Sequence, residues 1–164
     1  GRPKVANFTN PLAKFQIGKG ILLNKGNDVT IVATGHLVWE AIQAAVKLNK
    51  NGINAEIINI HTIKPLDEDI ILNSVNKTGC LVSAEEHNIF GGLGESVARL
   101  LTSKAPYPQE FVGTNDTFGE SGTPIELMNK YGLNMDSIYE AVINVLKRKI
   151  KWEYLFYYYL PQVP

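Results

Sequence analysis

The chain has 164 residues, the size of one ordinary domain with its own hydrophobic core. Sixteen Lys and Arg residues balance 16 Asp and Glu residues, so charge gives no reason to expect nucleic acid or an anionic membrane as a partner. No apolar run approaches the roughly 20 residues that span a bilayer. The single cysteine, Cys80, excludes an intrachain disulfide and indicates a reducing, cytoplasmic environment.

The first part of the chain predicts a linker followed by the edge of a sheet. Residues 1–16 lack a periodic apolar pattern, and we expect them to be a linker from a missing upstream domain. Residues 21–23 are apolar and precede a turn at residues 25–28, which predicts a pair of strands at one edge of a sheet. Residues 29–33 are β-branched and apolar, as in a buried strand.

A helix is expected next, because apolar residues recur at the spacing of one helical face at Val38, Ala41, Ile42, Ala45 and Val46. The helix ends at an Asn-Gly pair, since glycine tolerates the left-handed conformation of a helix terminus. Another strand follows. A strand–helix–strand unit of this kind predicts parallel strands joined by a right-handed crossover.

The alternation continues to residue 149. A second helix opens at Pro65-Leu66-Asp67, with Asp67 as the N-cap, and Thr123 with Glu126 predicts a capping box at a later helix. The remaining expected elements are strands at residues 55–60, 80–84 and 110–113, a loop at 85–92, and helices at 66–75, 93–101, 124–131 and 138–146.

This order predicts an α/β domain over residues 17–149, with three α/β/α layers around a mixed, mostly parallel sheet. Ligands on such sheets bind beyond the carboxyl ends of the strands. The composition changes after Lys149, because six of the 15 aromatic residues lie within eight positions. Residues 150–164 are thus a separate aromatic tail, which docks on the domain, packs between chains or is foreign to the protein.

Three histidines, His36, His61 and His87, fall at the carboxyl ends of predicted strands. They suggest a metal site or an acid–base cluster at that edge. Alternatively, they cap loops or line an interface. We favour the second interpretation because no close ligand spacing is present, and we expect no metal site and no catalytic residue in this chain.

A dense polar and glycine-rich cluster follows the strand at residues 80–84. Its members are Glu85, Glu86, His87, Gly91, Gly92 and Gly94. Glycines at a helix N-terminus allow close backbone approach and can hold an anion or a nucleotide. The dinucleotide fingerprint is not met, however. The other interpretation, which we favour, is a tight turn that packs against a neighbouring domain.

Two motifs in combination resemble the C-terminal domain of the transketolase family. One is residues 64–67, Lys-Pro-Leu-Asp, and the other is the Glu-Glu-His at 85–87 followed by Gly-Gly-x-Gly at 91–94. The similarity extends from about residue 17 to residue 148, and Glu86-His87-Asn88 is most similar to the split transketolases. The resemblance implies a five-stranded sheet whose first strand is antiparallel to the others.

The resemblance also implies a division of labour. Family members bind thiamine diphosphate and Mg²⁺ in a pyrophosphate-binding and a pyrimidine-binding domain, whose motifs this sequence lacks. The cofactor supplies the chemistry and the protein positions it. The chain is therefore expected to be a structural part of a dimeric enzyme that transfers two-carbon ketol groups between sugar phosphates, and to be inactive alone.

The same resemblance gives one candidate substrate contact. The context of Arg2 is similar to that of a family arginine that contacts the sugar phosphate, and a guanidinium binds two phosphate oxygens at once. Three alternatives stay open: a regulatory domain that binds an anion or nucleotide at the glycine turn, a deoxyxylulose phosphate synthase, and a 2-oxo acid dehydrogenase beta subunit. The donor and acceptor sugars do not follow from these residues.

Overall fold

A computed structural model describes residues 6–10 and 12–159 of the chain, with side chains as far as residue 149. Five strands form one sheet in the order β1-β3-β2-β4-β5. The strands are β1 (Ile21–Asn24), β2 (Val29–Ala33), β3 (Ala55–Asn59), β4 (Leu81–Asn88) and β5 (Gln109–Thr114). β1 is antiparallel to β3, and the other neighbours are parallel. The predicted mixed sheet with an antiparallel first strand is therefore confirmed.

The expected pairing of the first two strands is wrong. β1 pairs with β3, and the turn between β1 and β2 carries the chain across the start of β3. Asn27 and Asp28 donate their backbone N–H groups to the Asn54 carbonyl, both at 3.1 Å. A side chain at Gly26 would place its Cβ 2.3 Å from the Ala55 carbonyl carbon. Glycine at this position thus lets the turn cross the neighbouring strand at backbone contact distance.

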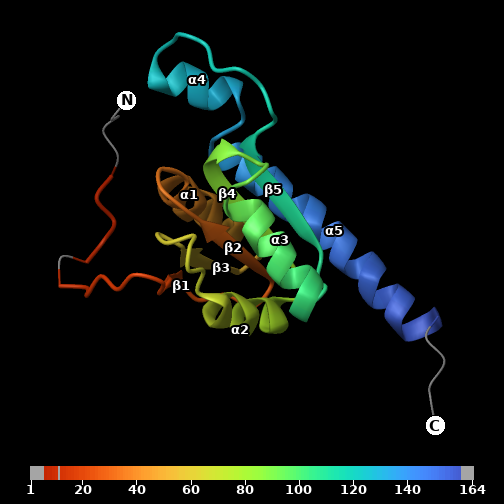
Figure 1. Ribbon diagram of the computed structural model, residues 1–164. Helices are drawn as coiled ribbons and strands as arrows, with labels where there is room; N and C mark the ends of the chain where they lie inside the picture. The colour runs from red at the N-terminus through yellow and green to blue at the C-terminus, as the bar shows by residue number, and fades with distance from the viewer. Residues whose placement is uncertain (1–5, 11, 160–164) are drawn as a thin grey trace.

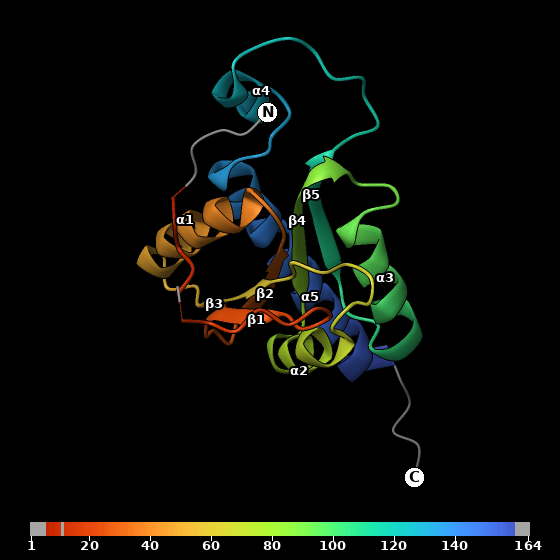
Figure 2. The same ribbon diagram turned by 60° about the vertical axis from the view of Figure 1, so that its left-hand side comes forward.

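Helices cover both faces of the sheet, which confirms the three-layer architecture (Figures 1 and 2). α1 (Leu37–Lys50) and α5 (Met135–Tyr159) pack on one face, and α2 (Glu68–Thr78) and α3 (Leu93–Lys104) on the other. Successive residues of a strand alternate between the two cores, because side chains of a strand point to opposite faces. Ile31 lies in the core under α1, and Val32 lies in the core under α2 and α3.

Three local expectations need correction. Val46 is 52% exposed, because the buried stripe of α1 is centred on Ala41, Ala44 and Leu48 and leaves Val46 outside it. The expected loop at residues 85–88 is the end of β4, where Asn88 pairs with Thr114 after a shift of register. Asp67 stands at the N-cap of α2 but makes no side-chain bond to that helix.

Asp67 instead joins the start of β1 to the start of α2. Its Oδ2 accepts the Gly20 N–H at 2.9 Å, and its Oδ1 lies 3.6 Å from the Lys19 ammonium. The carboxylate is buried, with 7% of its side chain exposed. The Lys-Pro-Leu-Asp element is therefore part of the attachment of the antiparallel edge strand.

One element stands outside the layers. α4 (Pro124–Lys130) begins with the predicted capping box, in which Thr123 Oγ1 accepts the Glu126 N–H and Glu126 accepts the Thr123 N–H. None of its residues is buried, and Figure 1 shows it projecting beyond the ends of β4 and β5. Among the described helices, none is long and apolar enough to cross a membrane.

Candidate functional site at the carboxyl edge of the sheet

The carboxyl ends of β2, β3, β4 and β5 meet at one edge of the sheet, and this carboxyl edge contains three adjoining hollows. The first, of about 310 Å³, lies between the ends of β2 and β4 and is lined by His36, Ile63 and Glu86. The second, of about 390 Å³, lies between Glu86 and α4. The third, of about 240 Å³, lies between His36 and α4. His36 and Glu86 each line two hollows, so the three form one continuous surface.

Glu85 is the most deeply placed of the predicted site residues. Only 2% of its surface is exposed, and both carboxylate oxygens face the first turn of α3. Oε2 accepts the Leu93 N–H and Oε1 accepts the Gly94 N–H, each at 2.7 Å. The free N–H groups of a helix N-terminus carry partial positive charge and favour an anion. In this chain the anion at that position is its own carboxylate.

Gly92 is required by this arrangement. A Cβ at residue 92 would lie 2.1 Å from Glu85 Oε2, so any side chain would displace the carboxylate. Gly91 donates its N–H to Glu95 Oε2 at 2.5 Å. Carboxylates of the chain therefore occupy the donors of Gly91, Leu93 and Gly94. The glycines do permit close approach of an anion to the backbone, but the anions that approach are carboxylates of the same chain.

The rest of the predicted cluster points outward. Glu86 and His87 are exposed, and His87 Nδ1 lies 2.9 Å from the Asn88 carbonyl oxygen. The Asn88 side chain fixes the following turn, because its Oδ1 accepts the Phe90 N–H at 3.0 Å and its Nδ2 donates to Asp116 at 3.0 Å. The turn presents the Phe90 ring to solvent, with 62% of the residue exposed.

The three histidines do not form one cluster, because His36 and His87 both line the first hollow but His61 does not. His61 lies under the ring of Phe15, with the ring centroids 4.5 Å apart, and its Nδ1 is 3.0 Å from Thr62 Oγ1. His36 Nε2 lies 4.0 Å from Glu40 Oε1. Within the described part of the chain, no three His, Cys, Asp or Glu side chains are grouped as metal ligands would be.

Two of these histidines carry buried ring nitrogens that lack a hydrogen-bond partner in the described structure. They are His36 Nδ1 and His61 Nε2. Glu40, beside His36, uses its other oxygen to accept the Met135 N–H at 2.8 Å and so ties α1 to the start of α5. Arg2, the predicted phosphate contact, lies outside the described residues.

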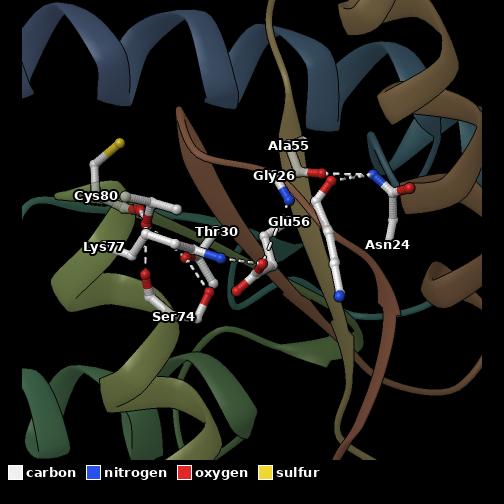
Figure 3. Close-up of polar contacts among 10 residues, drawn as sticks. Asn24, Gly26, Thr30, Ala55, Glu56, Ser74, Lys77 and Cys80 are labelled. Carbon is white, nitrogen blue, oxygen red and sulfur yellow. Dashed lines mark hydrogen bonds and ion pairs between the residues drawn. The ribbon is translucent and has the colours of Figure 1, made fainter.

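Sequence reasoning missed a polar network at the opposite, amino edge of the sheet (Figure 3). Thr30 Oγ1 lies 2.6 Å from Ser74 Oγ and 2.7 Å from Thr78 Oγ1, and all three residues are buried. Glu56 pairs with Lys77 and accepts the Gly26 N–H at 3.3 Å. The available signal was Thr30 and Glu56 at the second position of two strands that are otherwise apolar apart from Asn59. The network joins α2 to the sheet.

Comparison with known proteins identifies the fold family. The model of the family "Transketolase, C-terminal domain" matches residues 18–138, most of the chain. The chain belongs to this family. The resemblance inferred from the two sequence motifs is thus confirmed.

Relatives of this transketolase C-terminal domain include a transketolase subunit and a synthase. The 6-deoxy-6-sulfo-D-fructose transketolase subunit of Clostridium sp. (strain MSTE9) is 46% identical over 136 residues, which cover 83% of this chain and 42% of the relative. The 1-deoxy-D-xylulose-5-phosphate synthase of Desulforudis audaxviator (strain MP104C) is 38% identical over 77% of the chain and 20% of the relative.

A solved structure described as a split gene transketolase, inactive beta4 tetramer, superposes with a TM-score of 0.86 at 41% identity. The match covers 88% of this chain and 48% of that chain. The matched part of the chain thus covers less than half the length of each of these relatives.

Proposed function

We propose that this chain is the C-terminal structural and interface domain of a thiamine-diphosphate-dependent transketolase, with residues 17–149 as the domain and residues 1–16 as its linker. The observation that carries the proposal is the family membership together with the internal occupation of the α3 N-terminus by Glu85. The chain holds a complete two-sided core of its own. The α3 N-terminus, which could bind an anion, already holds the Glu85 carboxylate.

The described residues of this chain do not fit thiamine diphosphate or Mg²⁺. A diphosphate needs free donors, but the N–H groups of Gly91, Leu93 and Gly94 are bonded to internal carboxylates. Mg²⁺ prefers oxygen ligands around an octahedron, and the described residues bring no three acidic or histidine side chains together. We therefore assign both groups to the pyrimidine-binding and pyrophosphate-binding parts, located elsewhere in the enzyme.

The reaction that we propose for the complete enzyme is transfer of a two-carbon ketol group between sugar phosphates. The similarity to a transketolase subunit from Clostridium supports ketol transfer, but that relative is named for a sulfonated sugar, so the sugar phosphates rest on the resemblance alone. Arg2 is retained as the candidate contact to a substrate phosphate, and the complete enzyme is proposed to be a cytoplasmic dimer. The similarity to a 1-deoxy-D-xylulose-5-phosphate synthase keeps that reaction as the second candidate.

A ligand titration tests whether this chain alone binds the cofactor, phosphate or a nucleotide. The thermal midpoint of this chain is measured with thiamine diphosphate plus Mg²⁺, with inorganic phosphate and with ATP. A ligand that binds the native state raises apparent stability by mass action. We expect no saturable shift with any of the three.

The complete protein, with its upstream part and any partner chain, is then assayed for thiamine-dependent ketol transfer. Activity there, without ligand response in the chain alone, supports the proposal. A saturable shift with phosphate or ATP would instead support the regulatory anion-binding alternative. A shift with thiamine diphosphate plus Mg²⁺ would show that the chain binds the cofactor itself.

A further inference from the structure

We propose that Asn51 and Gly52, at the end of α1, form a latent modification site at which the chain deamidates itself. In the folded chain the end of α1 holds the pair in an unreactive geometry, so the reaction is confined to molecules in which this helix end has opened. The proposal concerns the chemistry of this chain alone and does not depend on the proposed function.

The sequence gives the pair its reactivity. Asn51 is the one asparagine of the chain that glycine follows directly. Glycine has no side chain to hinder its backbone nitrogen and leaves the backbone free to turn, so this nitrogen can reach the side-chain carbonyl carbon of the preceding asparagine. Both residues are exposed, and a Cβ at Gly52 would meet no atom within 4 Å. Water therefore has free access to the pair.

The reaction balances with water as its co-reactant. The Gly52 nitrogen gives its proton to solvent base and bonds to Asn51 Cγ. The bond from Cγ to Nδ2 then breaks, and Nδ2 leaves as ammonia after taking a proton from the solvent. The product is a succinimide ring. Water opens this ring at either carbonyl, which leaves at residue 51 either aspartate with a normal backbone or isoaspartate with the backbone routed through the side chain.

Hydrogen bonds in the last turn of α1 occupy both reacting nitrogens. The Gly52 N–H donates to the Asn49 carbonyl at 3.0 Å, and Asn51 Nδ2 donates to the Lys47 carbonyl at 3.0 Å. A backbone nitrogen that donates its hydrogen to a carbonyl does not give that hydrogen to solvent. The nucleophile is therefore not formed while the last turn of the helix is intact.

The backbone angle of Asn51 adds a second barrier. Its ψ is 16°, which turns the Gly52 nitrogen almost in line with the backbone nitrogen of Asn51 and away from Cβ and Cγ. Ring closure requires the Gly52 nitrogen on the side of Cβ. Gly52 itself has a φ of 77°, the left-handed conformation that ends many helices. The reaction thus needs rotation about the bond described by ψ, and this rotation breaks the hydrogen bond from Gly52 to Asn49.

The turn that follows the pair ties α1 to the amino edge of the sheet. Asn49 Nδ2 donates to Asn54 Oδ1 at 2.9 Å, and the Asn54 N–H donates to Asp28 Oδ2 at 2.6 Å. Aspartate at residue 51 adds negative charge beside the carbonyls that end α1, which is unfavourable at a helix C-terminus. Its carboxylate also cannot donate to the Lys47 carbonyl. Each reacted molecule is therefore a permanent record that the helix end has opened, and its amino edge is weakened.

Deamidation rates measured by peptide mass spectrometry test the proposal. The folded chain and a peptide of residues 47–56, which is too short to form a stable helix, are incubated in the same mildly alkaline buffer. We expect Asn51 to react at least about tenfold more slowly in the folded chain, because reaction there awaits local opening of the helix end. Asn144, which precedes a β-branched valine, is the internal reference and should stay unmodified. Equal rates in chain and peptide, or no reaction in the peptide, would overturn the proposal.

Asn54→Ala tests whether the helix end provides the protection. It removes the bond between the side chains of Asn49 and Asn54, which is an exposed contact, so the variant should fold, as circular dichroism verifies. Asn51 should react roughly threefold faster in the folded variant, since loss of the bond makes opening easier. Asn144→Ala, an exposed change on α5, is the matched control and should leave the rate unchanged. An unchanged rate in folded Asn54→Ala would show that the end of α1 does not control the reaction.

Asn51→Asp reproduces one product of the reaction and tests its effect on the fold. Amide exchange of residues 48–54 should become roughly threefold faster, because the new carboxylate lies at the C-terminus of α1 and has lost the donor. Asn144→Asp adds the same charge at an exposed position of α5 and should leave this exchange unchanged. Equal exchange in Asn51→Asp and the unmodified chain would refute the weakening of the amino edge.

Discussion

At the scale of single residues, Glu85 explains why a glycine-rich helix start does not serve as an open anion site. The carboxylate accepts two backbone N–H bonds from the first turn of α3, and Gly92 leaves room for it. Hydrogen bonds to a charged group contribute about 1.5–3 kcal/mol each. The residue therefore fixes the joint between β4 and α3, and with it the turn that presents Phe90.

Glu85→Gln should lower the free energy of unfolding by about 2 kcal/mol, because the amide cannot accept from both N–H groups and leaves a buried donor unpaired. Chemical denaturation of the variant measures the loss. Glu86→Gln is the matched control, since Glu86 is the exposed neighbour, and should change stability by less than about 0.5 kcal/mol. Equal stability of Glu85→Gln and the unmodified chain would contradict the structural role of the carboxylate.

The sequence predicted Glu85 and Glu86 as members of this cluster but did not show that one is buried and the other exposed. Glu85 and Glu86 are adjacent and chemically identical, and only their strand positions separate them. Because β4 continues to Asn88, Glu85 faces inward and Glu86 outward. A loop at residues 85–92 was expected instead, since charged residues rarely lie inside a strand end. The pairing of Asn88 with Thr114 that overrides this tendency joins residues far apart in the chain.

At the scale of elements, α4 is stabilised locally. Its capping box was predictable from Thr123 and Glu126 because both bonds join residues three positions apart. None of its residues is fully buried, so the cap stabilises α4 together with the half-buried Met128, which packs against the core. The edge strand β1 is the contrasting case. Its partner, β3, is chosen by the turn that crosses at Gly26 and by the Asp67 bond to Gly20, which no local pattern reveals.

Thr123→Ala should open α4 without destabilising the domain. Loss of an N-cap typically costs about 1 kcal/mol, which predicts roughly fivefold faster amide exchange in residues 126–131. The thermal midpoint should stay within about 1 °C, because only the half-buried Met128 of α4 packs against the core. Thr102→Ala, at an exposed position inside α3, is the control and should leave α4 exchange unchanged. A large drop in the midpoint would show that α4 belongs to the global folding unit.

At the scale of the whole molecule, the layers were predictable and the hollows at the carboxyl edge were not. Apolar periods of two and 3.6 residues lie in consecutive stretches of sequence, so strands, helices and the α/β/α architecture follow from them. The three hollows and the unpaired ring nitrogens depend on how loops meet after folding. The polar network at the amino edge depends on contacts such as Thr30 with Thr78, 48 residues apart.

That network should set the acid stability of the whole domain. Burial would raise the pKa of Glu56, but hydrogen bonds from Lys77, Ser74 and the Gly26 N–H outweigh it and hold the pKa below the ordinary value. A carboxyl group whose pKa is lower in the folded state stabilises the fold above its unfolded pKa, near 4.5. This stabilisation is lost as the pH falls through the lower, folded pKa.

Glu56→Gln should therefore reduce the free energy of unfolding by about 1–2 kcal/mol at pH 7, where Lys77 is half exposed and solvent screens part of the attraction. The difference between the variant and the unmodified chain should shrink as the pH falls below about 4.5, because the unmodified carboxylate then becomes protonated as well. Urea denaturation from pH 7 to pH 3 measures both curves. Glu140→Gln, an exposed change on α5, is the control and should leave the pH dependence of the free energy of unfolding unaltered. A constant difference between Glu56→Gln and the unmodified chain from pH 7 to pH 3 would show that Glu56 does not cause the loss of stability in acid.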